Sequence, residues 1–292
     1  MELCRLDDRS TPQQQEMLCA VLSSLYASDR LQADALECDS FGAVAAAATK
    51  YWGSERVQDV ACISYRNLAR RGEALETLME YNVVDLIVKA MKGYRMSKSI
   101  QNNACCALWR IGTGTESAAQ KIAESGAIGY IVNAIQTHLD TFGVLENACG
   151  ALWALIHRSE KLAHQFIGME SGLESVMCIF VVHPMSMSLL EKACGLLAFT
   201  SAISSPSPPV LSDAIGSVVE ALRSNEPSSN LLLQAAFFLR TATTRHQGLA
   251  GEARAAIPVL IAALKDLTRS DIFFREVCCF LWAISEFSYE AK

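Results

Sequence analysis

The sequence predicts an all-α fold in which one helical unit is repeated along the chain. Three observations carry this prediction. A similar segment, in most copies a small residue followed by cysteine, returns every 42 to 45 residues. Apolar residues within each copy are spaced as on one face of a helix, and Gly, Asn and Pro fall between the predicted helices. Together these features favour six to seven units over the 292 residues.

The copies align on one anchor position in each unit. They are clearest in residues 57–69, 100–111 and 144–155. Positions 0, +3, +4 and +7 from the anchor are apolar in nearly every copy, which at about 100° per residue forms one stripe along a helix. The anchors are Leu18, Ala61, Ala104, Ala148, Ala193, Ala235 and Val277.

Each unit therefore contains one long amphipathic helix. After an N-terminal segment, residues 1–11, we treat residues 12–292 as one repeat array. The long helices are predicted near residues 12–27, 56–70, 98–112, 143–157, 187–201, 229–243 and 272–287.

Two shorter helices fill the space between successive long ones. Gly126 is predicted to end one of them, because glycine readily takes the left-handed conformation at a helix C-terminus. The same break is predicted at Asn82, Gly172 and Gly216. All seven prolines fall in connections or in the first turn of a helix, where proline is tolerated. Three helices per unit distinguish this repeat from those with two.

Several segments match the armadillo repeat at the right spacing. They are Glu124-Ser-Gly-Ala-Ile128, Val57-Gln58, Asn67-Leu68 and Ala148-Cys-Gly-Ala-Leu152. The chain resembles the armadillo family from about Pro12 onward, at the level of the superfamily and not of one member. The resemblance implies a right-handed α-solenoid of about six to seven three-helix repeats, whose third helices line a concave groove that binds proteins.

Groove contacts are expected on the side of each long helix opposite its apolar stripe. Positions −1 and +6 lie there and are mostly polar. Amide side chains can hydrogen-bond an extended peptide through both a donor and an acceptor, so Asn103 and Asn147 lead the candidates; the alternative is that both only cap or solvate a helix. The candidate groove residues are Asn67, Asn103, Arg110, Asn147, Lys192, Gln234 and Thr241.

Three tryptophans share position +5, on the flank between the core and the groove. Trp109, Trp153 and Trp282 could form an aromatic edge for a ligand, as such residues do at binding hot spots. The alternative is packing between neighbouring long helices. Gly150 and Gly195, at +2, either leave room in the groove or allow close helix packing.

Composition and motifs argue against catalysis. We find no nucleotide-binding loop, nucleophile elbow or zinc-protease motif, and the five histidines are scattered, so we expect neither an enzyme nor a cofactor or metal. The net charge of −6 and the absence of basic runs disfavour nucleic acid as a partner. No apolar stretch is long enough for a membrane span. The eleven cysteines are predicted to be reduced and buried, and with no signal sequence we expect a cytoplasmic location, a nuclear one remaining open.

The leading functional hypothesis is a scaffold or adaptor that binds an extended or helical segment of a partner protein in the groove. The family resemblance leaves three alternatives: an Hsp70-type co-chaperone acting in nucleotide exchange, a nuclear import adaptor, and a cytoskeletal or ciliary structural protein. The import adaptor is disfavoured because only Asn67 keeps its asparagine at +6. The apolar helix at 272–287 suggests further repeats, a partner or self-association at that end.

Overall fold

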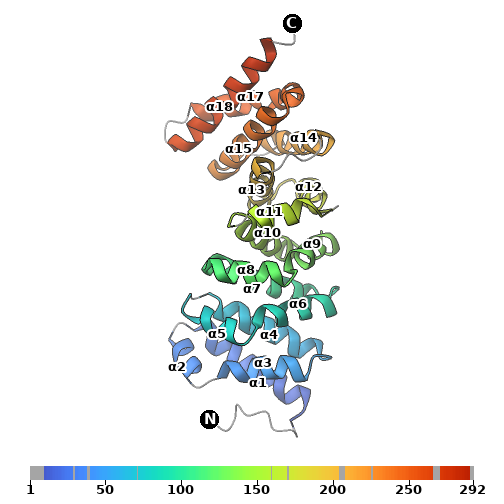
Figure 1. The fold of residues 1–292 in the computed structure, drawn as a ribbon, viewed down its shortest axis with the longest axis vertical. Helices are drawn as coiled ribbons and strands as arrows, with labels where there is room; N and C mark the ends of the chain where they lie inside the picture. Colours follow the sequence, from blue (N-terminus) through green and yellow to red (C-terminus); the bar gives the residue numbers. More distant parts are fainter. Residues whose placement is uncertain are drawn as a thin grey trace. The chain divides into compact units, whose positions relative to one another are not determined.

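The computed structural model describes residues 10–28, 30–37, 40–70, 72–158, 160–169, 171–203, 208–224, 226–265 and 270–289. Within these ranges the chain forms helices, turns and connections and no β-strand. It divides into two compact units, unit 1 up to Arg158 and unit 2 after it. Each unit is an all-α solenoid of stacked helices, labelled in Figure 1.

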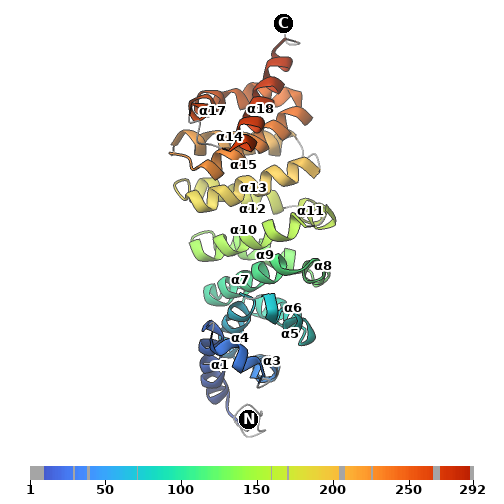
Figure 2. The ribbon, with the colours of Figure 1, turned by 90° about the vertical axis from the view of Figure 1, so that its left-hand side faces the viewer.

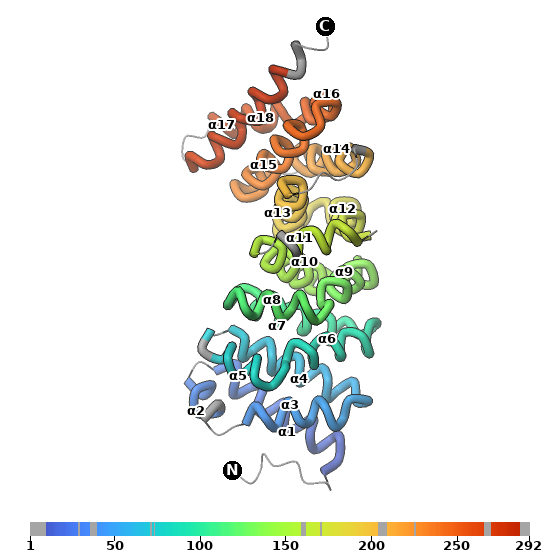
Figure 3. Tube along the Cα trace, in the orientation of Figure 1, coloured from blue at the N-terminus to red at the C-terminus, as the bar shows by residue number. Residues whose placement is uncertain are grey.

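In unit 1 short helices precede each long helix after the first, as the repeat predicts. Its long helices are α1 (Pro12–Ala27), α4 (Glu55–Leu68), α7 (Lys98–Gly114) and α10 (Phe142–Ile156). Its shorter helices are α2 (Leu31–Glu37), α3 (Ser40–Lys50), the 3-10 helix η2 (Gly72–Ala74), α5 (Leu75–Glu80), α6 (Val83–Gly93), α8 (Glu116–Glu124) and α9 (Ala127–Thr137). Two of these precede α4, two precede α10, and two with the added 3-10 turn precede α7. The tube in Figure 3 follows the chain from α7 through α8 and α9 to α10.

Two layers of helices make up unit 1. The long helices contact one another in the order α1, α4, α7, α10, and Figure 2 shows them stacked in this order. The second helices contact one another in the order α3, α6, α9. Ile100, Leu108 and Ile111 of α7 are fully buried. They belong to the apolar stripe that the anchor spacing predicts, so burial of this stripe holds neighbouring helices together.

Unit 2 repeats the arrangement with less regular short helices. Its long helices, α13 (Met187–Ile203), α15 (Ser229–Arg245) and α18 (Asp271–Tyr289), contact one another in sequence. Before α13 come α11 (Glu160–Ile167) and α12 (Gly172–Val182), and before α15 comes α14 (Pro208–Ser224). Between α15 and α18 lie η3 (Gln247–Leu249), α16 (Ala250–Ala253), η4 (Arg254–Ala256) and α17 (Ile257–Leu264).

The long helices begin within one residue of their predicted starts and end within two residues of their predicted ends. Local sequence explains several starts. Pro12 occupies the first position of α1, and Thr11 and Gln14 form a reciprocal capping box around it. Ser228 caps α15 by accepting a hydrogen bond from the Leu231 amide at 3.0 Å.

Two of the four predicted breaks have the expected left-handed backbone. Asn82 has φ 51° and Gly126 has φ 74°, and each directly precedes a second helix, α6 and α9 respectively. Asparagine is the non-glycine residue that most readily adopts this conformation. The prediction is therefore confirmed at Asn82 and Gly126.

Gly172 is the first residue of α12, and it differs from the other two breaks. Its φ is not positive; instead a Cβ at this position would lie 2.5 Å from the Phe166 carbonyl oxygen, so glycine permits a close backbone approach. The break predicted at Gly216 is wrong, because α14 continues through it. Ile215, Val218 and Leu222 are buried on both sides of Gly216, and this continuous apolar stripe stabilises a single helix.

The cysteines largely follow the prediction, and the six described prolines lie in connections or in the first turn of a helix. The nine cysteines in the described residues are free thiols, and six of them are buried. Cys178 and Cys278 are exposed, so the expectation of burial is wrong for these two. Cys4, Cys38 and Pro206 lie outside the described residues. In the described parts of the chain no helix has the length and apolar character needed to cross a membrane.

Candidate functional site

The candidate residues of unit 1 lie on three neighbouring long helices, α4, α7 and α10. We call this surface the unit 1 long-helix face and define it by Arg66, Asn67, Asn103, Arg110 and Asn147. Asn103 is buried, and the other four side chains are half-buried. Because α4 contacts α7 and α7 contacts α10, the structure brings these residues onto one continuous surface.

Asn103 connects α4 to α7 through its whole amide group. Its Nδ2 donates to Asp59 Oδ1 at 2.9 Å and to Ser99 Oγ at 3.4 Å. Its Oδ1 accepts a hydrogen bond from Arg66 Nη1 at 2.8 Å. The side chain is only 4% exposed. In this structure Asn103 therefore pairs within the protein, with a residue of its own helix and with two residues of the preceding long helix.

The two +6 residues of this face each make the same kind of hydrogen bond, which their positions alone did not predict. Asn67 Nδ2 donates to the Ser23 carbonyl oxygen at 3.0 Å, and Arg110 Nη1 donates to the Arg66 carbonyl oxygen at 2.7 Å. In both cases the acceptor is the +5 carbonyl of the preceding long helix. The contact fixes the direction of each side chain, and an arginine keeps further N–H donors for a ligand.

Asn147 also pairs with the preceding long helix. Its Nδ2 donates to Asn102 Oδ1 at 2.9 Å and makes a longer contact of 3.5 Å with the Asn102 carbonyl oxygen. The side chain is half-buried. An amide has a separate carbonyl oxygen with two lone pairs, so Asn147 Oδ1 can accept a hydrogen bond from a ligand.

Charges of both signs meet on this face around Cys106 of α7. Burial raises the pKa of the Cys106 thiol, while Arg110 and Arg66 lower it and Glu146 raises it. Desolvation is the largest of these effects, so the net shift of the pKa is upward. Two guanidinium groups and one carboxylate, from three successive long helices, therefore lie close enough to act on the Cys106 thiol. The face is therefore mixed in charge.

The tryptophans of unit 1 differ in their surroundings. A Cβ added at Gly150 would lie 2.6 to 2.7 Å from three ring atoms of Trp109, so this indole packs on the backbone of α10. Trp153 is 37% exposed and stacks on His157 with ring centroids 5.0 Å apart. Trp109 thus packs between long helices, whereas Trp153 offers an accessible aromatic surface.

The unit 2 candidates lie on α13 and α15. Lys192 Nζ donates to Ser188 Oγ at 3.0 Å, one turn back on the same helix. Thr241 is buried, and its hydroxyl donates to the Phe237 carbonyl oxygen of its own helix at 2.7 Å. Gln234 is half-buried. Thr241 therefore pairs with its own backbone, while Lys192 and Gln234 remain partly accessible.

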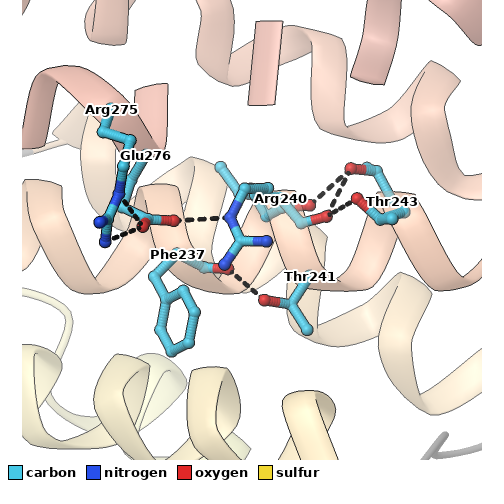
Figure 4. A network of polar contacts seen from close by, with 8 residues as sticks. Phe237, Arg240, Thr241, Thr243, Arg275 and Glu276 are labelled. Atoms are coloured by element: carbon cyan, nitrogen blue, oxygen red, sulfur yellow. Dashed lines mark hydrogen bonds and ion pairs between the residues drawn. The ribbon is translucent and has the colours of Figure 1, made fainter. Parts of the chain in front are cut away.

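An ion-pair cluster connects α15 to α18 (Figure 4). Arg240 Nε contacts Glu276 Oε2 at 2.6 Å, and Arg275 Nη2 contacts Glu276 Oε1 at 3.0 Å. The Arg240 guanidinium also lies 5.1 Å from the centroid of the Phe237 ring. Arg240 and Glu276 occupy positions +5 and −1 of successive units, as Arg66 and Asn103 do in unit 1. Comparing +5 of one unit with −1 of the next in the sequence would have revealed this pairing.

Trp282, the third member of the predicted aromatic edge, lies on α18 and is 65% exposed. Ile272 of the same helix is also exposed. The last long helix therefore exposes apolar side chains, as its sequence predicts. Within the described residues, no group of three or more His, Cys, Asp or Glu side chains is arranged to hold a metal ion.

Comparison with known proteins identifies the fold. No family model and no curated protein matches the chain. Among solved structures it is similar to the designed armadillo repeat protein YIII(Dq)4CqI, with a TM-score of 0.63 and 17% identity over 79% of this chain and 94% of that one. An engineered protein matches with a TM-score of 0.65 and 17% identity over 83% of this chain and 98% of that one.

A third solved structure is also similar to the chain. A structure from work on a phosphorylation switch that controls the interaction between cadherin and beta-catenin aligns with a TM-score of 0.72 and 15% identity. The alignment covers 94% of this chain and 60% of that one. At such low identity the similarity concerns the fold, and the chain has the armadillo-repeat fold.

Proposed function

We propose that this protein is an interaction scaffold that holds an extended or helical segment of a partner protein on the unit 1 long-helix face. One observation carries the proposal: Asn67, Arg110 and Asn147 are each fixed by a hydrogen bond to the preceding long helix. Their remaining donors and acceptors are thus oriented before a ligand arrives. Such preorganisation lowers the entropy cost of binding.

The chemistry of this face suits a peptide main chain. A peptide offers carbonyl oxygens and amide N–H groups, which match the remaining N–H donors of Arg110 and the Oδ1 acceptor of Asn147. Trp153 adds accessible aromatic surface, the type of group that dominates many interaction hot spots. Because Arg66, Arg110 and Glu146 give both signs of charge, we propose a segment of mixed charge and not a polybasic one.

The fold supports the same conclusion by analogy. The cadherin and beta-catenin structure comes from a system in which one protein interacts with another. An extended surface built from repeated helices is well suited to such binding.

The experiment is affinity capture with the full chain, followed by mass spectrometry. The test variant combines Arg110→Ala, Asn147→Ala and Trp153→Ala and leaves the buried Asn103 intact. The matched control combines Glu116→Ala, Gln120→Ala and Glu124→Ala, three exposed residues of α8 in the same unit. We expect wild type and control to capture a shared set of proteins that the test variant loses, with equal helicity by circular dichroism. Retention of that set by the test variant would refute the assignment.

A further inference from the structure

A second surface of unit 2 lies between its shorter helices. α12 contacts α14, and an open groove runs between them toward α16. Its two parts have volumes of about 330 and 770 Å³ and share Val181, Gly216 and Ser217, so they are continuous. We call this surface the α12–α14 groove. It is lined on α12 by Met177, Cys178 and Val181, and on α14 by Asp213, Gly216 and Glu220.

The α12 side of the groove is an uncovered apolar stripe. Two lining residues, Cys178 and Val181, are exposed, Val181 to 76%; Val182, which does not line the groove, is exposed next to them. These residues are spaced i, i+3 and i+4, so they lie on one face of α12. Phe180 lines the groove but is itself buried. Contiguous apolar surface of this kind is typical of sites where another protein docks.

The α14 side is kept open by the missing side chain of Gly216. Gly216 is exposed, and no atom lies within 4 Å of the position that its Cβ would occupy. Glycine inside a helix is normally unfavourable because it increases the freedom of the unfolded chain. Here it gives a ligand access to the α14 backbone opposite Val181.

The rim of the groove is acidic. Glu174, Asp213, Glu220 and Glu252 line it, and among the described residues no Lys, Arg or His lines it. Arg223 of α14 is exposed but does not line the groove. Negative charge disfavours nucleic acid and anionic lipid, both of which attract basic surfaces. It favours a ligand that carries Lys or Arg beside its apolar surface.

We propose that the α12–α14 groove binds an amphipathic helix of a partner protein whose apolar stripe is flanked by Lys and Arg residues. A helix presents apolar side chains at i, i+3, i+4 and i+7, which fit a groove between two other helices. An extended strand would need free main-chain partners, and α12 and α14 use theirs internally. The site is separate from the long-helix face, so either assignment can fail without the other.

The test uses a synthetic amphipathic helix of about five turns, with a leucine stripe flanked by lysines and a fluorescent label. Fluorescence anisotropy against the full chain should show saturable binding of this peptide. A matched peptide with glutamate in place of every lysine should bind at least about tenfold more weakly. Equal binding of the two peptides, or none of the lysine peptide, would overturn the proposal.

Two variants locate the binding. Gly216→Phe fills the groove and should weaken binding by about tenfold or more. The control Gly53→Phe alters an exposed turn of unit 1, where a Cβ also meets nothing within 4 Å, and should bind like wild type. Equal melting temperatures would show that both variants fold. A correctly folded Gly216→Phe variant with wild-type affinity would contradict the proposal.

Two exposed thiols of unit 2 provide an independent footprint. Cys178 lines the groove, whereas Cys278 lies on α18. Saturating lysine peptide should slow the alkylation of Cys178 by iodoacetamide at least about tenfold, since covered thiols are inert, and leave the rate at Cys278 unchanged. An unchanged rate at Cys178 under saturation would place the peptide elsewhere and overturn the assignment.

Discussion

The indole of Trp109 on α7 lies against the backbone of Gly150 on α10. A Cβ on residue 150 would come within 2.6 Å of Trp109 Cδ2 and 2.7 Å of Cε2 and Cε3. The tryptophan at +5 of one repeat thus requires the glycine at +2 of the next. This contact sets how closely the two long helices approach, so it contributes to the shape of the unit 1 long-helix face.

The contact predicts opposite effects for one substitution at two helical glycines. Gly150→Ala should destabilise the protein by roughly 1 to 3 kcal/mol, because the tryptophan ring must move from a packed position. Gly216→Ala should stabilise it by about 0.5 to 1 kcal/mol, because its Cβ enters open space and alanine favours the helix. Urea unfolding measures both changes. The same sign for the two variants would contradict the packing.

The bonds of Asn103 predict a structural role that Asn147 does not share. Asn103→Ala should lower the free energy of unfolding by about 2 kcal/mol, because it removes three hydrogen bonds at a buried site and leaves Arg66 and Asp59 less well paired. Asn147→Ala, at a half-buried position, should cost less than about 1 kcal/mol. Thermal and urea unfolding of both variants test the difference. Equal losses would argue against it.

The ion-pair cluster of Figure 4 predicts unequal roles for its two arginines. Arg240→Ala should destabilise by about 2 kcal/mol, because it removes the more buried partner of the buried Glu276 carboxylate. Arg275→Ala should cost less than about 1 kcal/mol, since Arg275 is exposed and its pair is screened by water. Unfolding at low and high salt separates the two effects. A larger loss for Arg275→Ala would contradict this ranking.

Thiol reactivity should follow burial. Burial raises the pKa of Cys19 to about 12 and raises the pKa of Cys62 and Cys194 well above the usual range. A raised pKa lowers the fraction of reactive thiolate at any pH below it. At pH 8 and pH 9 the native protein should therefore be alkylated at Cys178 and Cys278 long before these three. Peptide mass spectrometry gives each rate, and rapid modification of Cys19 would show that its site is not buried.

The sequence predicts the long helices well because their positions depend on a property of single segments. An apolar stripe such as that of Leu108 and Ile111 is buried wherever the repeat stacks. The left-handed turns at Asn82 and Gly126 are equally local. The sequence alone wrongly predicts a break at Gly216, because a glycine that ends a helix and one that lines a groove look the same in a sequence. The buried stripe on both sides of Gly216 decides between them.

The contacts of the candidate site depend on neighbouring repeats, so single positions could not predict them. Asn103 and Asn147 share position −1, yet Asn103 pairs with Arg66 and Asp59 of α4, whereas Asn147 pairs with Asn102 of α7. Trp109 and Trp153 share position +5, yet Trp109 packs on Gly150 of the following long helix, whereas Trp153 stacks on His157 at the end of its own helix. These contacts can be predicted only by comparing each repeat with its neighbour, because the sequence of one helix does not contain the partner residue.

Site-specific photo-crosslinking in cells tests the central claim most directly. A benzophenone amino acid would replace Trp153 on the long-helix face, and in a control chain it would replace the exposed Gln120 on α8. We predict a discrete crosslinked protein from position 153 that is absent from position 120 and is lost when Arg110→Ala and Asn147→Ala are added. The same adducts from both positions, or adducts at 120 alone, would contradict a binding role for this face.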